Sequence, residues 1–306
     1  MHVNKESGST KNESEGHSRD VIIVEVGPRD GLQNEAQLIP TDVKVAFIDA
    51  LSRAGLPVIE ATSFVNPKAV PQLADADLVM AGIQRSPGVS YPCLVPNERG
   101  YSRARAAGAT EIALFTAATD EFASANVGTT IDGTFTRFAP VLAAARDDHV
   151  PVRGYVSVAF GCPYAGAVEP LAAITVAQRL FDAGCAEVSL ADTIGAATPD
   201  LVNSLLMAAR DVLPQAQLAM HFHDTSGTAI ANVETALEFG VRIFDSAVGG
   251  LGGCPFAPGA PGNLSTERLV ARLDMLGLRT GVDLGAVSAA AAIVAPFIPR
   301  LELEVA

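Results

Sequence analysis

The sequence contains no tryptophan, only 6% aromatic residues and four cysteines. The cysteines are Cys93, Cys162, Cys185 and Cys254, and no two of them are spaced as a CxxC pair. A chain of 306 residues does not need disulfide bonds to stabilise its core. We therefore interpret the four cysteines as reduced thiols in a reducing compartment, which excludes a small disulfide-stabilised fold.

Long hydrophobic runs and positive charge are also scarce. The longest apolar stretch, VSAAAAIVAPFI, is short and contains Ser288 and Pro296, so we predict no membrane span and no membrane partner. The net charge of −13 argues against a nucleic-acid partner. Residues 1–20 are polar and lack the apolar centre of a signal peptide, and their acidic residues fit a transit peptide poorly. We expect a disordered polar tail and a cytoplasmic protein.

From residue 21 onward, short runs rich in valine and isoleucine alternate with longer helical patterns. Eight such strand–helix units predict an α/β protein with a (β/α)₈ barrel, formed by residues 21–306 as one catalytic domain. VDLGAVSAAAAIVAPFI is expected to add a C-terminal helical segment, and this segment makes a homodimer plausible. The alternative is a doubly wound open sheet, which is disfavoured because no GxGxxG motif follows the first strand. The expected strands are 21–26, 57–62, 89–95, 111–116, 152–160, 186–192, 216–223 and 241–248.

Polar residues gather after the expected strands. In a barrel of this kind the carboxyl ends of all strands meet at one face, where reactive residues belong. Thr41 and Thr198 are expected to cap the helices that follow two of these ends. The charged and metal-competent residues at the strand ends are Arg29, Asp30, Gln33, Glu60, Asp192, His221, His223, Asp224, Cys254 and Asn263.

The segment HFHD gives the sharpest local signal. His221 and His223 are two positions apart on a strand, so their side chains point to the same face and can bind one divalent cation. Asp30 and Asn263 supply a carboxylate and an amide oxygen at the same end of the barrel. Such a mixture suits Mg²⁺ or Mn²⁺ and also admits Zn²⁺. The alternative interpretation is a pair of hydrogen-bonded core histidines.

Three charged residues are expected to support this site. Glu60 lies in an apolar strand and needs a partner when buried. We expect that partner to be Arg29, since neighbouring side chains on a strand point apart and weaken a direct pair between Arg29 and Asp30. Asp192 has two interpretations: it fixes the tautomer of a histidine, or it caps the next helix.

Several motifs together resemble the 3-hydroxy-3-methylglutaryl-CoA lyase family over residues 20–280. They are VEVGPRDGLQNE, IEATSFVNPKAVPQ, GYVSVAFGCPY, ADTIG, HFHDT and GLGGCPFAPGAPGN. RDG and HxH also occur in isopropylmalate and homocitrate synthases, whereas the cysteine-containing last motif favours the lyases. Ala36 and Ala191 depart from the lysine and glycine that the family pattern leads us to expect.

The resemblance implies a metal-dependent C–C lyase that cleaves hydroxymethylglutaryl-CoA, an acyl-CoA, into acetyl-CoA and acetoacetate in leucine breakdown and ketone-body metabolism. It assigns the cation to Asp30, His221, His223 and Asn263, and catalysis to Arg29 with Glu60 as its supporting acid. It places Gln33, Tyr155 and Asp192 near the substrate and Cys254 in an active-site loop. The general base is expected to be Asp30 or His221.

Three other functions are compatible with parts of this pattern. A lyase for a longer branched acyl-CoA would share every residue named above. A Claisen-type condensing synthase is disfavoured by the cysteine-containing loop. A non-catalytic metal-binding barrel is disfavoured because Arg29 and Cys254 are present beside the expected cation ligands.

Overall fold

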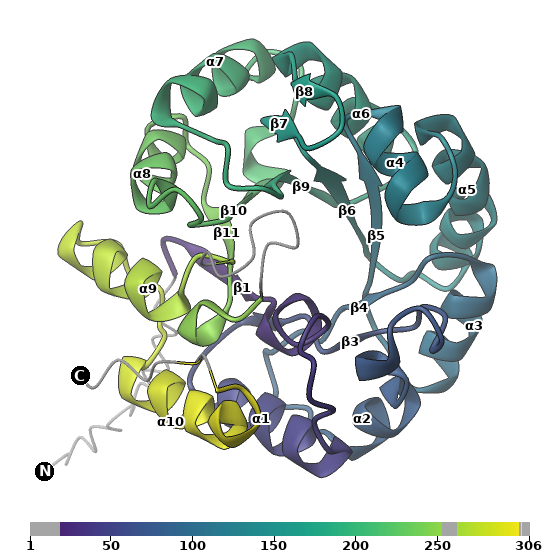
Figure 1. The fold of residues 1–306 in the computed structure, drawn as a ribbon, viewed down its shortest axis with the longest axis vertical. Coiled ribbons are helices and arrows are strands. Elements are labelled where there is room, and N and C mark those ends of the chain that lie inside the picture. Colours follow the sequence, from purple (N-terminus) through teal and green to yellow (C-terminus); the bar gives the residue numbers. More distant parts are fainter. Residues whose placement is uncertain (1–18, 253–261, 300, 302–306) are drawn as a thin grey trace, which may run out of the picture.

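The computed structural model describes residues 19–252, 262–299 and 301. Among these residues, nine strand segments form one parallel sheet that curls into the ring seen in Figure 1. The segments are β1 (Ile22–Glu25), β2 (Val58–Ile59), β3 (Thr62–Ser63), β4 (Cys93–Leu94), β5 (Ile112–Ala117), β6 (Val152–Ser157), β9 (Glu187–Asp192), β10 (Leu218–Phe222) and β11 (Ile243–Ser246).

The ring closes at the second expected strand. The sheet order begins with β2 and ends with β3, and these two segments are separated in the chain only by Glu60 and Ala61. The Glu60 N–H donates to the Glu25 carbonyl on one side at 2.9 Å, and the Ala61 N–H donates to the Pro92 carbonyl on the other side at 3.0 Å. β2 and β3 are therefore two halves of one strand, which confirms the eight-stranded barrel.

Helices surround the ring in Figure 1, and a continuous apolar core fills the space between them and the sheet. Thr198 accepts a hydrogen bond from the Leu201 N–H and caps its helix, as predicted. Thr41 does not act as a cap, because it is already the first helical residue and its hydroxyl donates to Asp75. The helices are α1 (Thr41–Arg53), α2 (Ala76–Gly82), α3 (Glu98–Ala106), α4 (Asp120–Val127), α5 (Ile131–Asp147), α6 (Pro170–Asp182), α7 (Pro199–Ala209), α8 (Ala229–Glu238), α9 (Thr266–Met275) and α10 (Leu284–Val294).

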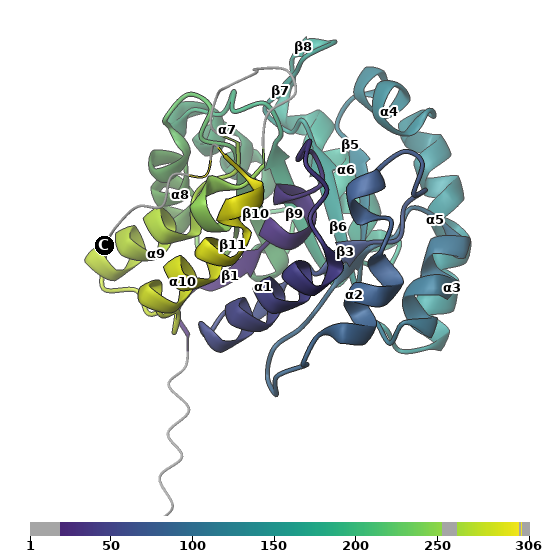
Figure 2. The same ribbon diagram turned by 60° about the horizontal axis from the view of Figure 1, so that its bottom comes forward.

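Two segments near the catalytic face differ from the expectation. Gly27–Gly31, where we expected Arg29 and Asp30 on extended chain at the end of the first strand, forms a short π-helical turn. The expected strand 152–160 ends at Ser157, because Val158 takes a φ of 53° and donates its N–H to the Thr193 hydroxyl. The following residues form a hairpin of β7 (Gly161–Cys162) and β8 (Gly166–Ala167), which projects beyond the barrel in Figure 2.

The chain ends contribute to the outer layer. The predicted C-terminal helix is present as α10, which packs against α1 and α9 (Figure 2). Arg19 and Asp20, which we had placed in the tail, bond to residues of the turn before α10; residues 1–18 lie outside the described part of the chain. In that described part, the helices are too short or too polar to span a bilayer.

Candidate active site and cation site

The structure brings the described candidate residues together at the carboxyl end of the barrel. Arg29 and Asp30 lie in the π-helical turn after β1, and Glu60 lies between β2 and β3. His221 lies on β10, and His223 just beyond it pairs with Asn263. The predicted convergence of Asp30 with His221, His223 and Asn263, which are far from it in the sequence, is therefore present. Cys254 lies outside the described residues.

Three of these side chains could hold a cation. Asp30, His221 and His223 each offer one ligand atom, and these atoms lie within 4.8 Å of one another. The Asn263 amide nitrogen donates to Asp30 Oδ2 and to the Leu251 carbonyl, both at 2.9 Å. This leaves Asn263 Oδ1 buried without a hydrogen-bond partner among the described residues, and His223 Nδ1 is in the same state. Buried polar atoms normally have partners, so this donor set fits a divalent cation.

The two histidines differ in their surroundings. Burial and the neighbouring His221 lower the pKa of His223 to about 4, so His223 is neutral and able to bind a metal at pH 7. Burial also acts to lower the pKa of His221, but the hydrogen bond from its Nδ1 to Asp245 Oδ2, at 3.2 Å, and the negative charges of Asp245 and Asp30 together outweigh burial and raise it. This contact leaves Nε2 of His221 as the atom available to a cation.

Asp192 does not orient a histidine. Its carboxylate accepts the N–H groups of Ala196 and Ala197, at 2.8 and 3.1 Å, in the turn before α7. These N–H groups precede Thr198, the residue that caps α7, so Asp192 holds the turn that leads into the helix and does not itself cap the helix, as one of the two interpretations had it. The histidine partner is Asp245, which lies directly beside His221 in the register of β10 and β11, whereas Asp192 lies beside Phe222.

Arg29 is held by two carboxylates. Its Nη2 lies 2.7 Å from Glu60 Oε2, as predicted, and its Nη1 lies 2.6 Å from Asp30 Oδ1. The expectation that Arg29 and Asp30 point apart was wrong, because the segment is helical rather than extended. Burial acts to raise the pKa of Asp30, but the charge of Arg29 and the nearby histidines outweigh burial and lower it to about 2. The Arg29 Nε is buried without a partner among the described residues.

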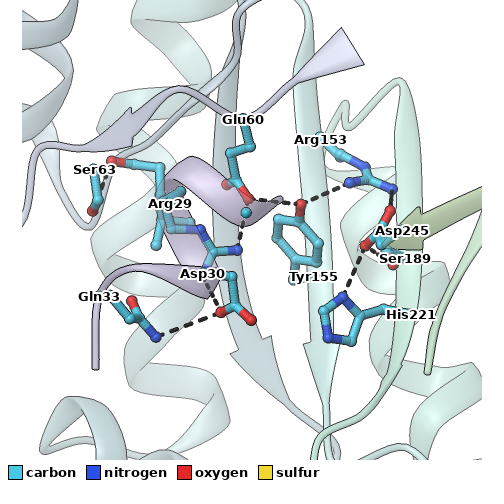
Figure 3. A network of polar contacts seen from close by, with 12 residues as sticks. Arg29, Asp30, Gln33, Glu60, Ser63, Arg153, Tyr155, Ser189, His221 and Asp245 are labelled. Atoms are coloured by element: carbon cyan, nitrogen blue, oxygen red, sulfur yellow. Dashed lines mark hydrogen bonds and ion pairs between the residues drawn. The ribbon is translucent and has the colours of Figure 1, made fainter. Parts of the chain in front are cut away.

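Tyr155 and Gln33 also lie at this site. The Tyr155 hydroxyl donates to Glu60 Oε2 at 3.2 Å, and the Arg29 guanidinium lies 5.5 Å from the centre of the Tyr155 ring. Gln33 reaches Asp30 Oδ1 at 3.5 Å. Figure 3 shows how these side chains face one another across the end of the barrel.

Besides Asp245, two buried charged residues near the site were missed in the sequence. Arg153 lies on β6 and bonds to Asp245, while Glu25 on β1 accepts hydrogen bonds from the backbone of Gly27 and Val248 and from the Thr266 hydroxyl. Each is a lone charge in an apolar strand. The rule that identified Glu60, that a buried charge needs a partner, would have identified these residues too.

A family model described as HMGL-like matches residues 20–294 of the chain. The chain belongs to the HMGL-like family. It is 55% identical over 264 residues to the rat mitochondrial hydroxymethylglutaryl-CoA lyase, covering 86% of this chain and 81% of that protein. This places the Arg29–Asp30 turn and the two histidines in an HMGL-like barrel.

Solved structures of HMGL-like proteins share the whole barrel. The HMG-CoA lyase from Brucella melitensis superposes with a TM-score of 0.90 at 49% identity, covering 92% of this chain and all of that one. The HMG-CoA lyase from Acinetobacter baumannii, solved in complex with coenzyme A and 3-methylmalate, superposes with a TM-score of 0.86 at 38% identity, covering 90% and 91%. These likenesses agree with the (β/α)₈ assignment.

Proposed function

We propose that this protein cleaves 3-hydroxy-3-methylglutaryl-CoA into acetyl-CoA and acetoacetate, with Mg²⁺ or Mn²⁺ at Asp30, His221, His223 and Asn263. The observation that carries the proposal is the placement of Arg29 beside this cluster, with a buried Nε that has no partner among the described residues. The names of the relatives and their coverage of the chain support the same substrate.

The reaction breaks the bond between the methylene carbon next to the thioester and the carbon that bears the hydroxyl group. A base removes the hydroxyl proton, the hydroxyl carbon becomes the ketone of acetoacetate, and the bonding electrons pass to the thioester as an enolate. One proton returned to the methylene carbon completes acetyl-CoA. The bound cation would orient the substrate oxygens and acidify the hydroxyl group.

Arg29 is suited to stabilise the enolate. Its guanidinium keeps a full positive charge, and Glu60 and Asp30 fix its plane through bonds to Nη2 and Nη1. The remaining Nε–H can donate to the thioester oxygen as negative charge develops there. A preformed donor in a buried site needs no reorganisation during the reaction.

Asp30 is the base that we favour of the two candidates. His221 Nδ1 is engaged by Asp245, so a His221 that binds the cation through Nε2 has no nitrogen left to accept a proton. Each Asp30 oxygen retains lone pairs beyond its bonds to Arg29 and Asn263. We expect Asp30→Asn to reduce kcat far more than it reduces Mn²⁺ affinity, because the amide keeps an oxygen ligand.

Cys254 is proposed, from the sequence resemblance, to deliver or relay the final proton. The Cys254→Ser variant tests this role through turnover and through solvent deuterium incorporation into acetyl-CoA. Unchanged turnover and unchanged deuterium incorporation would remove the thiol from the reaction.

The direct test of the proposed function is acetoacetate release from hydroxymethylglutaryl-CoA, measured with Mg²⁺ or Mn²⁺ and again after a chelator. We expect turnover that disappears on chelation and returns with added metal. Arg29→Gln is expected to lower kcat by about 10²–10³-fold, the loss typical of a missing oxyanion donor, and to keep most of the Mn²⁺ affinity. A raised KM with unchanged kcat would mean that Arg29 only binds substrate.

Two alternative activities are separated by the same assay. A lyase for a longer branched acyl-CoA would release no acetoacetate but would cleave its own substrate with the same metal requirement. A condensing synthase would consume acetyl-CoA. Participation in leucine breakdown and ketone-body metabolism, the cytoplasmic location and the homodimer stay predictions from the sequence.

A further inference from the structure

A second buried guanidinium lies in the barrel interior and takes no part in the proposed chemistry. Arg153 on β6 is 2% exposed and contacts three polar groups, of which Figure 3 shows the Tyr155 hydroxyl and Asp245. Nη1 donates to the Tyr155 hydroxyl at 2.6 Å, Nη2 lies 2.5 Å from Asp245 Oδ1, and Nε lies 2.5 Å from Glu187 Oε1. The planar guanidinium fixes these three directions at once.

Two of these contacts lead to the active site. The Tyr155 hydroxyl donates to Glu60, whose same oxygen binds Arg29 at 2.7 Å. Asp245 uses its other oxygen to bind Nδ1 of His221. On one branch Tyr155 and Glu60 thus connect Arg153 with Arg29. On the other branch Asp245 alone connects Arg153 with His221.

We propose that Arg153 is a positioning residue that orients the enolate-stabilising Arg29 and the cation ligand His221 together. Without its guanidinium, Asp245 would be a buried carboxylate with no cation beside it, and the histidine would lose a fixed partner. On the other branch, the Tyr155 hydroxyl would be free to turn away from Glu60. The inference rests on the proposed roles of Arg29 and His221.

Arg153→Lys is the main test, because lysine keeps the charge but cannot span three fixed directions. Titration calorimetry of the metal-free protein with Mn²⁺ is expected to give an affinity about tenfold below that of the wild type, the lower end of the loss for a direct partner of a metal ligand, because Arg153 acts on His221 through Asp245. At saturating Mn²⁺, kcat is expected to stay reduced, through the branch to Arg29.

Lys44→Gln is the matched control. Lys44 is also a buried cation, 4% exposed and 2.8 Å from Asp75, but it lies on α1 outside the barrel. This variant is expected to lower Tm and to keep the Mn²⁺ affinity. The inference is overturned if Arg153→Lys behaves in the same way, with a lowered Tm but with Mn²⁺ affinity and kcat within about twofold of the wild type.

The two branches can also be tested separately. Tyr155→Phe removes the hydroxyl that connects Arg153 with Glu60 and is expected to lower kcat at unchanged Mn²⁺ affinity. Asp245→Asn is expected to lower Mn²⁺ affinity. When either substitution is combined with Arg153→Lys, the loss of kcat or of Mn²⁺ affinity in the double variant should be close to that of the more impaired single variant, because the residues act in one network. Fully additive effects would refute the connection.

These single variants keep the inference testable if Arg153→Lys does not fold. Normal kcat in Tyr155→Phe together with normal Mn²⁺ affinity in Asp245→Asn would overturn it. Mn²⁺ binding needs no substrate, so the branch to His221 can be judged even if the proposed lyase reaction fails.

Discussion

Substitution of Gly252 tests whether the position of the Asn263 amide matters to the proposed cation site. Its φ is +101°, a conformation that residues with a Cβ rarely adopt, and an added Cβ would lie 2.6 Å from the Asn263 amide nitrogen. Gly184 has a nearly equal φ of +105°, but a Cβ there would meet nothing within 4 Å. Gly252→Ala and Gly184→Ala therefore share the backbone strain and differ in the clash.

The expected magnitudes follow from these two contributions. The unfavourable backbone conformation costs about 1–3 kcal/mol in either variant. At Gly252 the Asn263 amide must also move, and it would lose its bond to Asp30 or to Leu251, both 2.9 Å long. One such bond contributes about 0.5–1.5 kcal/mol, which corresponds to roughly a 2- to 12-fold weaker cation site.

Thermal unfolding and Mn²⁺ titration of the metal-free variants separate the two effects. Both alanine variants should unfold at lower temperature, whereas only Gly252→Ala should bind Mn²⁺ more weakly. Equal Mn²⁺ affinities in the two variants would show that the position of the Asn263 amide does not matter to the cation, and Asn263 would lose its place among the ligands.

Two further predictions concern buried carboxylates. Glu60→Gln weakens the bond to Arg29 by about 1.5–3 kcal/mol and should lower kcat about 10- to 100-fold, while Mn²⁺ affinity should be kept. The control is Asp49→Asn on α1, which replaces a buried carboxylate bonded to the Gln84 N–H and should leave kcat unchanged. Burial raises the pKa of Glu25 to about 7, so the folded protein binds this proton more tightly than the unfolded chain, and stability falls as pH rises from about 4.5 to about 7. Glu25→Gln should remove up to about 3 kcal/mol of this loss. In urea-unfolding experiments the free energy of unfolding of the variant should equal that of the wild type near pH 5 and exceed it at pH 8. The same difference between variant and wild type at both pH values would contradict the argument.

Much of the site could be predicted because a parallel barrel brings all its strand ends to one face. Once the strands were counted correctly, this rule was enough to place four residues on that face: Arg29, Asp30, His221 and Asn263. The local shape of the chain was harder to predict. We expected extended chain at Arg29 and Asp30, with their side chains pointing apart, but Gly27–Gly31 is helical and this form brings the two side chains into contact.

The sequence by itself determined the alternation of strands and helices, the face on which the polar side chains gather and the side chains that we propose as cation ligands. Only the tertiary structure decided which carboxylate pairs with His221. Asp192 and Asp245 both stand near the ends of strands that flank β10, but the register sets Asp245 beside His221 and Asp192 beside Phe222. Side chains alternate between the two faces of a strand, so a shift of one residue decides whether a carboxylate faces the barrel interior or the helices. That register depends on the closure of the whole barrel, which no single segment of the sequence encodes.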